Sequence, residues 1–341
     1  MREEFAKEYI SYGIKANACY QGNYHLSTPI GRAILAKKAV EIAKKENADC
    51  IAHGCTGKGN DQVRIEGYVV ALEPKIKILA PVREWNMDRN AEIKYAQKNN
   101  IPIPASLDFP YSDDDNMWGI TWEGGEITNP TQIVPEEKFL TTYTLPKNAP
   151  DEPGIVTLDF NQGLPVALNG TKMSLAKLIV KLNKLAGKHG VGTVYLLEDR
   201  IVGLKNRGVY EHPAAHVIIE AHKNLEKYVC TRVQNELKEI SDIKWGYLCY
   251  GAQWYDPAMQ SINHFNDFIN QKVTGKVQIR LFKGNTTVIT VQSPYALDHA
   301  SFNNTEGYGL NVNASAGFIE IYSLQMKLAN QLSVKNKKDK K

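Results

Sequence analysis

The stretch AHGCTGKGNDQVRIE, residues 52 to 66, decides the fold. A short apolar run, residues 50–53, comes just before it, and a helical pattern over 61–72 follows. Three glycines at a strand-to-helix turn let the backbone approach a ligand closely, and the first N–H groups of the helix attract anions. Because ligands bind at the carboxyl ends of parallel strands, the stretch predicts a ligand site in an α/β domain.

The flanking segments extend this pattern in both directions. Helical spacing of apolar residues covers residues 2–16, 31–46 and 88–99, and a second buried strand is predicted over 76–81. Strands that alternate with helices predict a parallel sheet covered on both faces.

The second half of the chain has a different, α+β pattern. Strands are predicted over 155–160, 164–168 and 193–198, a hairpin over 276–292, and helices over 174–188, with Ser174 as N-cap, and within 214–272. A last helix from about Ser323 carries apolar residues at helical spacing. Such a helix either docks on its own core or reaches a neighbouring subunit, and the sequence leaves both possibilities open.

Composition excludes several classes of protein. A net charge of +4 over 341 residues, with lysines and acids interspersed, argues against nucleic-acid binding, and the basic run 335–341 is expected to be a disordered, solvated tail. No apolar run approaches 18 residues and no secretory signal is present, so membrane insertion and export are not expected. Five cysteines without CxxC spacing predict reduced thiols in a cytoplasmic protein, with no disulfide framework and no zinc site.

The glycines of the opening stretch match neither common phosphate-binding motif. Gly54 and Gly59 have the Walker separation, but Asn60 follows where lysine is required, and the order G-x-x-G-x-G differs from the dinucleotide pattern. In one interpretation Asn60 is the helix N-cap, Asp61 favours the helix dipole and Arg64 is its ion-pair partner. The sharper hypothesis, which also accounts for neighbouring Thr56 and Lys58, is a site for a small zwitterion.

Several motifs in the same order resemble one family. HGCTGKGNDQVRIE is very similar to the HGATGKGNDQVRFE signature of argininosuccinate synthases, and the likeness covers nearly the whole chain. It includes these segments: KIKILAPVREW at 75–85, IPIP at 101–104, YSDDDN at 111–116, AGKHGVG at 186–192, EDRIVGLKNRGVYEHP at 198–213 and GFIEIYSLQMKL at 317–328.

The resemblance implies an ATP-dependent ligase that joins citrulline to aspartate. The ureido oxygen of citrulline attacks the α-phosphorus of ATP, and the aspartate amine then displaces AMP; magnesium accompanies the ATP. The implied architecture is an adenine-nucleotide α-hydrolase-like domain over 1–105, an α+β synthetase domain over 106–312 and an oligomerisation arm with a basic tail over 313–341. The family suggests a cytoplasmic homotetramer.

The resemblance also implies site residues. Gly54 would line the nucleotide, and Thr56, Asn60 and Asp61 would hold aspartate. The residues implied for citrulline are Tyr24, Thr28, Asn60, Arg64, Ser112, Thr121, Glu198 and Tyr210. No catalytic base and no protein-bound metal are expected, because positioning and charge stabilisation suffice for such a reaction. His53 is interpreted as a packed histidine rather than a base.

Taken singly, each of these residues has a simpler explanation. Glu198 suits a solvated strand end and Tyr210 a loop. The aspartates around Ser112 suggest an Asx turn or a cation site. The placement at family positions is what favours the functional interpretation.

This sequence departs from the family at its start and at a few site positions. It contains no SGGLDTS loop, which grips the ATP pyrophosphate in family members, and MREEFAKEY matches a family segment after the third strand. We expect exposed strand edges and weak ATP binding as a result. Three explanations remain: a longer true reading frame, a fragment, or a shortened non-catalytic relative that binds amino acids or acts as a scaffold. Pro29 after Thr28 also removes a backbone donor.

Overall fold

The computed structural model describes residues 1–87, 89–102, 110–298 and 311–338. The chain divides into two compact units, residues 1–295 and 296–341. The predicted boundary at 105/106 lies outside the described residues. The residues predicted to bind aspartate and those predicted to bind citrulline all fall within the first unit.

The described strands of the first unit form three sheets. The strands are β1 (Cys50–Ala52), β2 (Lys77–Leu79), β3 (Tyr111–Asn116), β4 (Gly119–Gly124), β5 (Gly154–Asn161), β6 (Leu164–Leu168), β7 (Thr171–Lys172), β8 (Thr193–Asp199), β9 (Lys205–Glu211), β10 (Gly275–Phe282) and β11 (Asn285–Gln292). The sheet orders are β1-β2, β3-β4-β9-β8 and β11-β10-β5-β6-β7.

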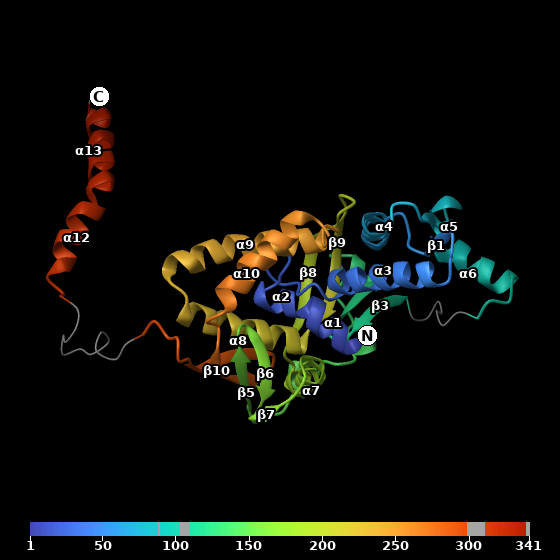
Figure 1. Ribbon diagram of the computed structural model, residues 1–341, viewed down its shortest axis with the longest axis horizontal. Coiled ribbons are helices and arrows are strands. Elements are labelled where there is room, and N and C mark those ends of the chain that lie inside the picture. The colour runs from blue at the N-terminus through green and yellow to red at the C-terminus, as the bar shows by residue number, and fades with distance from the viewer. Residues whose placement is uncertain (88, 103–109, 299–310, 339–341) are drawn as a thin grey trace. The chain divides into compact units, whose positions relative to one another are not determined.

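Helices cover these sheets (Figure 1). They are α1 (Arg2–Phe5), a π-helical turn η1 (Ala6–Ile10), α2 (Ser11–Lys15), α3 (Ser27–Lys45), α4 (Asp61–Leu72), α5 (Pro81–Glu84), α6 (Arg89–Lys98), α7 (Leu175–Lys188), α8 (Pro213–Val229), α9 (Arg232–Tyr250) and α10 (Pro257–Asn270), with single 3₁₀ turns η2 (Gly125–Thr128), η3 (Glu136–Lys138) and η4 (Pro146–Asn148). The second unit contains α12 (Ala314–Tyr322) and α13 (Leu324–Lys338).

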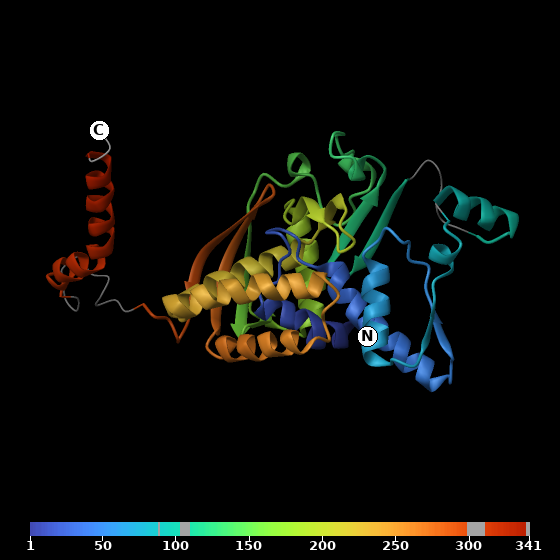
Figure 2. The ribbon, with the colours of Figure 1, turned by 90° about the horizontal axis from the view of Figure 1, so that it is seen from above.

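The predicted parallel pairing is present in the first part of the chain. β1 and β2 pair in parallel with Ile51 opposite Ile78, and α3 and α4 pack against each other beside them (Figure 2). Each strand has three residues and remains partly accessible, and Leu79 at the end of β2 is 46% exposed. The pair therefore forms a narrow sheet whose carboxyl end leads directly into the glycine-rich turn.

The second half has the predicted α+β character. α8 packs on β10 and β11 and also contacts α7 and α9, so it lies between the five-stranded sheet and the long helix α9 (Figure 1). Ser174 caps α7 as expected, accepting a hydrogen bond from the Lys177 N–H. In the four-stranded sheet, β4 and β9 pair with Thr121 opposite Tyr210, which brings two predicted citrulline residues into adjacent strands.

Two local interpretations differ from the structure. The Asx turn, one of the two simpler explanations of the aspartates around Ser112, is not formed, because residues 111–116 are strand β3 and pair along their length with β4. In the basic tail, residues 335–338 continue helix α13 instead of being disordered, which is consistent with the good helix propensity of lysine. The remaining tail residues, 339–341, lie outside the described part of the chain.

Candidate active site

The turn between β1 and α4 is built by its own polar groups. The Gly59 N–H donates to the Thr56 carbonyl at 3.1 Å, and the Gln62 side-chain amide donates to the carbonyls of Gly57 and Gly59 at 2.6 and 3.3 Å. His53 contacts Glu66 at 3.0 Å through Nε2 and accepts the Cys55 N–H through Nδ1, so its ring braces the turn, in agreement with a packed histidine. A Cβ at Gly54 would meet no atom of the described residues within 4 Å, so the turn has free space at that position.

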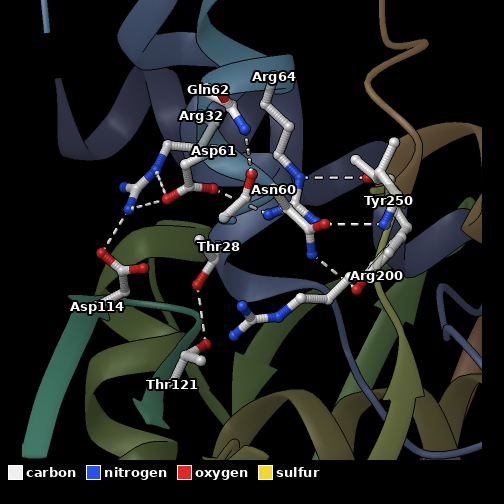
Figure 3. Close-up of polar contacts among 12 residues, drawn as sticks. Thr28, Arg32, Asn60, Asp61, Gln62, Arg64, Asp114, Thr121, Arg200 and Tyr250 are labelled. Atoms are coloured by element: carbon white, nitrogen blue, oxygen red, sulfur yellow. Dashed lines mark hydrogen bonds and ion pairs between the residues drawn. The ribbon is translucent and has the colours of Figure 1, made fainter. Parts of the chain in front are cut away.

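Asp61, the first residue of α4, is held between two arginines. Its carboxylate accepts from Arg64 Nη1 at 2.9 Å and from Arg32 Nε at 2.8 Å, and Arg32 continues to Asp114 on β3 (Figure 3). Burial alone would raise the pKa of Asp61, but the charges of Arg64 and Arg32 outweigh burial and lower that pKa. Asp61 is therefore an anion at neutral pH, and the Asp61–Arg64 pair that the sequence predicts is confirmed.

Arg64 is almost fully buried and has one nitrogen without a partner. Its Nε donates to the Tyr250 carbonyl at 3.2 Å and its Nη1 to Asp61, whereas Nη2 makes no hydrogen bond. A buried guanidinium N–H without an acceptor is costly, so this geometry favours an incoming anionic group. Arg64 lines the cavity described below, where a carboxylate would supply that acceptor.

Asn60 precedes α4 but does not cap it with its side chain. Its backbone is already in the helical region, with φ −71° and ψ −29°, so the side chain is turned away from the N–H groups of the first turn. The Asn60 carbonyl oxygen Oδ1 accepts the Ile201 N–H at 2.8 Å, and its Nδ2 donates to the Tyr250 hydroxyl at 2.8 Å. The expected N-cap hydrogen bond is thus replaced by contacts that tie the turn to the β8–β9 connection and to α9.

Hydroxyl groups from α3 and the four-stranded sheet form the opposite wall. Thr28 and Thr121 are 2.8 Å apart through their side-chain oxygens (Figure 3). The Tyr24 hydroxyl accepts the Thr28 N–H at 3.2 Å. The Tyr24 ring stacks on Tyr210 with centroids 4.1 Å apart. Burial raises the pKa of Tyr24 to about 12, so its phenol stays protonated and neutral in this wall.

Glu198 closes the far side of the site. The Tyr210 hydroxyl donates to its carboxylate at 2.8 Å, and only 3% of the residue is exposed. Burial raises the pKa of Glu198, and hydrogen bonds from Tyr210 and Tyr250 offset part of that rise. A buried carboxylate of this kind is stabilised when a cation binds beside it.

All eleven predicted site residues line one cavity of about 290 Å³. They come from the glycine-rich turn (Gly54, Thr56), from the α4 start (Asn60, Asp61, Arg64), from the segment before α3 and its first turn (Tyr24, Thr28), and from strands β3, β4, β8 and β9 (Ser112, Thr121, Glu198, Tyr210). A larger cavity of about 610 Å³ lies beside α1, α3 and α7 and has more apolar side chains in its wall. The density of charged and hydroxyl groups, rather than size, distinguishes the smaller cavity.

The cavity also contains polar residues that the sequence does not predict to bind substrate. Asp114, Glu123, Arg200 and Tyr250 line it, and Arg32 reaches it through Asp61. Arg200 lies two positions after Glu198 and pairs with Glu123 at 2.7 Å, while its Nη1 donates to the Lys58 carbonyl of the glycine-rich turn. The Glu-Asp-Arg run at the end of strand β8 is a signal for Arg200, but nothing local to residue 250 indicates that α9 ends at this site.

Comparison with known proteins identifies the family. A family model described as the arginosuccinate synthase N-terminal HUP domain matches residues 1–102, and one described as the arginosuccinate synthase C-terminal domain matches residues 111–329. The chain belongs to the argininosuccinate synthase family. The HUP domain supplies β1, the turn, α4 and the Tyr24 and Thr28 part of the hydroxyl wall, and the C-terminal domain supplies Thr121, Tyr210 and Glu198.

Curated relatives support the same assignment. The argininosuccinate synthase of Pyrococcus furiosus is 46% identical over 329 residues, which cover 96% of this chain and 79% of that protein. The corresponding enzymes of Staphylococcus saprophyticus and Streptococcus mutans are 44% and 42% identical, over 97% and 98% of this chain and 82% and 85% of theirs. The predicted fold class, a HUP-type α/β layer joined to an α+β domain, is confirmed.

Neither membrane spans nor metal clusters stand out in the described part of the chain. No helix there is both long and apolar enough to cross a bilayer. No group of three or more His, Cys, Asp or Glu side chains within the described ranges is arranged to hold a metal ion.

Proposed function

We propose that the chain ligates citrulline to aspartate at the expense of ATP, through a citrullyl-adenylate, with release of pyrophosphate and AMP. The observation that carries this proposal is the pairing, in one cavity, of a buried arginine with a free N–H and a buried glutamate. An α-amino acid presents a carboxylate and an ammonium on one carbon, and these two side chains complement both charges. Membership of the argininosuccinate synthase family indicates that the two amino acids are citrulline and aspartate.

Citrulline is the substrate that we place between Arg64 and Glu198. Its carboxylate would accept a hydrogen bond from the free Nη2 of Arg64, and its ammonium would lie against the Glu198 carboxylate. The neutral ureido group carries no charge to pair, so the hydroxyls of Tyr24, Thr28, Ser112 and Thr121 are suited to orient it. Holding the ureido oxygen in line with the phosphorus is the main contribution that such a site makes to rate.

Aspartate and ATP would occupy the end of the cavity at the glycine-rich turn. Thr56, Asn60 and Asp61 are the groups that we assign to aspartate, with the Asp61 carboxylate facing its ammonium. Gly54 lies after the β1 end, where a nucleotide approaches the backbone of this fold class. Mg²⁺ would be bound chiefly by the ATP phosphates, as is usual for this ion.

The proposal is tested by measuring products. The purified chain is incubated with ATP, Mg²⁺, citrulline and aspartate, and argininosuccinate, AMP and pyrophosphate are quantified, with reactions lacking each amino acid as controls. We expect the three products in equal amounts. Citrulline binding by calorimetry without pyrophosphate release would instead identify a non-catalytic amino-acid-binding relative.

The raised pKa of Glu198 predicts a pH dependence. Only the ionised carboxylate attracts the ammonium of citrulline, so affinity is present above the pKa of Glu198 and is lost as pH falls through it. Because burial places that pKa above its ordinary value of 4.5, we expect citrulline affinity to decline at higher pH than an exposed glutamate would allow. Calorimetric titrations across the acidic range check this; affinity that stays constant until the protein unfolds would contradict it.

We propose that residues 313–341 mediate assembly into a homotetramer. Within the second unit, the two helices leave large apolar side chains exposed, including Ile321 at 77%, Tyr322 at 75% and Leu332 at 64%. Apolar helical faces of this size commonly mark a protein contact. Deleting residues 313–341 is expected to reduce the assembly to smaller species, as measured by light scattering coupled to size exclusion. An unchanged mass would contradict this role.

We place the reaction in the cytoplasm. All five cysteines are free thiols, which is the state that a reducing compartment maintains.

A further inference from the structure

Tyr250, the last residue of α9, is buried in the wall of the cavity although no sequence motif marks it. Its ring stacks on Tyr20 with centroids 3.7 Å apart and planes 6° apart, and it meets Tyr24 edge-on at 6.4 Å. Gly246, one turn earlier, makes this approach possible, because a Cβ at that position would lie 2.1 Å from the Cys19 carbonyl. The helix end is thus fixed against the segment that carries Tyr24.

Tyr250 contacts each of the groups that would recognise the amino-acid end of citrulline. Arg64 lies over its ring at 4.8 Å, and its backbone carbonyl accepts Arg64 Nε. Its hydroxyl oxygen accepts Asn60 Nδ2 at 2.8 Å, and the same hydroxyl lowers the pKa of Glu198, which lines the cavity with it. One residue therefore contacts the guanidinium and the amide and acts on the carboxylate.

The hydrogen bonds around Tyr250 have one direction. The Ile201 N–H donates to Asn60, and the Asn60 amide donates to the phenol oxygen. The phenol proton is thus left for an acceptor such as Glu198, whose pKa Tyr250 lowers. Burial and the nearby Glu198 charge raise the pKa of Tyr250, so the phenol keeps its proton. Glu198 therefore accepts from Tyr210 on β9, and the Tyr250 phenol at the end of α9 also favours its ionised form.

We propose that Tyr250 is a positioning residue that sets the separation of Arg64 and Glu198 and so selects the α-amino-acid end of citrulline. The proposal rests on the proposed function, since it assigns that role at the same site. The ring and the backbone carbonyl of Tyr250 position Arg64, whereas the part of Tyr250 that acts on Glu198, in addition to Tyr210, is its hydroxyl. The contribution to Arg64 and the contribution to Glu198 can therefore be separated by removing the hydroxyl oxygen of Tyr250.

Tyr250→Phe is the decisive variant, and Tyr247→Phe is its matched control. Tyr247 lies three positions earlier on α9, also contacts the Tyr20 ring, at 5.0 Å, and is 48% exposed. For both variants and for the unaltered protein, calorimetry of the full chain measures citrulline affinity over a range of pH. Steady-state kinetics are measured for the same three proteins.

For Tyr250→Phe we expect citrulline affinity to fall about tenfold or more, as when a hydrogen bond to a charged group is lost. The KM for citrulline should rise by a similar factor while the KM for ATP changes little. The acidic fall-off of citrulline affinity should move to higher pH, because Glu198 loses a donor. A general loss of packing would not shift that pH profile, and Tyr247→Phe should leave all of these quantities unchanged.

Suppose that Tyr250→Phe leaves the citrulline affinity and its pH profile unchanged, while the unaltered protein binds and turns over citrulline normally. This result would overturn the role of Tyr250 and leave the proposed function intact. An equal fall in affinity at every pH would also overturn it, since the hydroxyl would then not act through Glu198. Failure of the unaltered protein to bind citrulline at all would overturn both.

Discussion

Replacing Arg64 with alanine should weaken citrulline binding by about 2–4 kcal/mol, the loss expected when one partner of a buried charged contact is removed. Arg64 is 3% exposed, and its Nη2 is a buried donor without a partner in the protein. The substitution removes the group that would bind the carboxylate. It also leaves Asp61 with Arg32 as its remaining arginine, so the local negative charge would repel that carboxylate further.

The measurement is calorimetric titration with citrulline, because binding does not require turnover. Arg232→Ala is a suitable control, since Arg232 lies at the exposed start of α9 and its ion pair there is with Glu236 one turn along. Retention of normal citrulline affinity in Arg64→Ala would remove this residue from the site. A matching loss in the control would point to a change in the fold rather than in the contact.

Replacing Glu211 with alanine should destabilise the protein by about 3 kcal/mol or more, because several donors lose a charged acceptor at once. Glu211, at the end of β9, is completely buried and accepts from the Trp122 indole, from the Thr141, Thr142 and Tyr143 N–H groups, and from the Thr142 hydroxyl. This single carboxylate fastens the 141–143 segment to the strand that carries Tyr210.

Urea unfolding, followed by tryptophan fluorescence, measures this loss as a lower midpoint. Glu211→Gln keeps an acceptor oxygen of similar size, so its loss of stability should be clearly smaller than that of alanine. Glu236→Ala, an exposed carboxylate on α9, should change the midpoint little. Equal stability of Glu211→Ala and the unaltered protein would show that the hydrogen bonds are replaced by water without cost.

Local chemistry explains why much of the fold is predictable from sequence. The glycine-rich turn is bounded by an apolar run and a helical pattern, and the structure places β1 and α4 there. Asp61 and Arg64 are three residues apart on one helix, so their contact follows from helix geometry alone. For the remaining site residues, each side chain has a plausible local role, and only the family resemblance suggests that they converge.

The contacts that sequence reasoning misses join residues far apart in the chain. Asn60 looks like an N-cap because the usual partner of such a residue is the next turn of helix, but its side chain is bound by residues 201 and 250. Tyr250 ends an amphipathic helix where an aromatic residue is commonly part of the core. Its role depends on how closely α9 approaches the Tyr20 segment, which is a property of tertiary packing.

The most direct test of the central claim is a crystal structure of the protein with citrulline bound. We predict that citrulline occupies the cavity between the glycine-rich turn and β8, with its carboxylate hydrogen-bonded to Arg64 Nη2 and its ammonium to Glu198. Citrulline bound in the larger cavity beside α1 and α7, or bound here with neither Arg64 nor Glu198 in contact, would contradict the account.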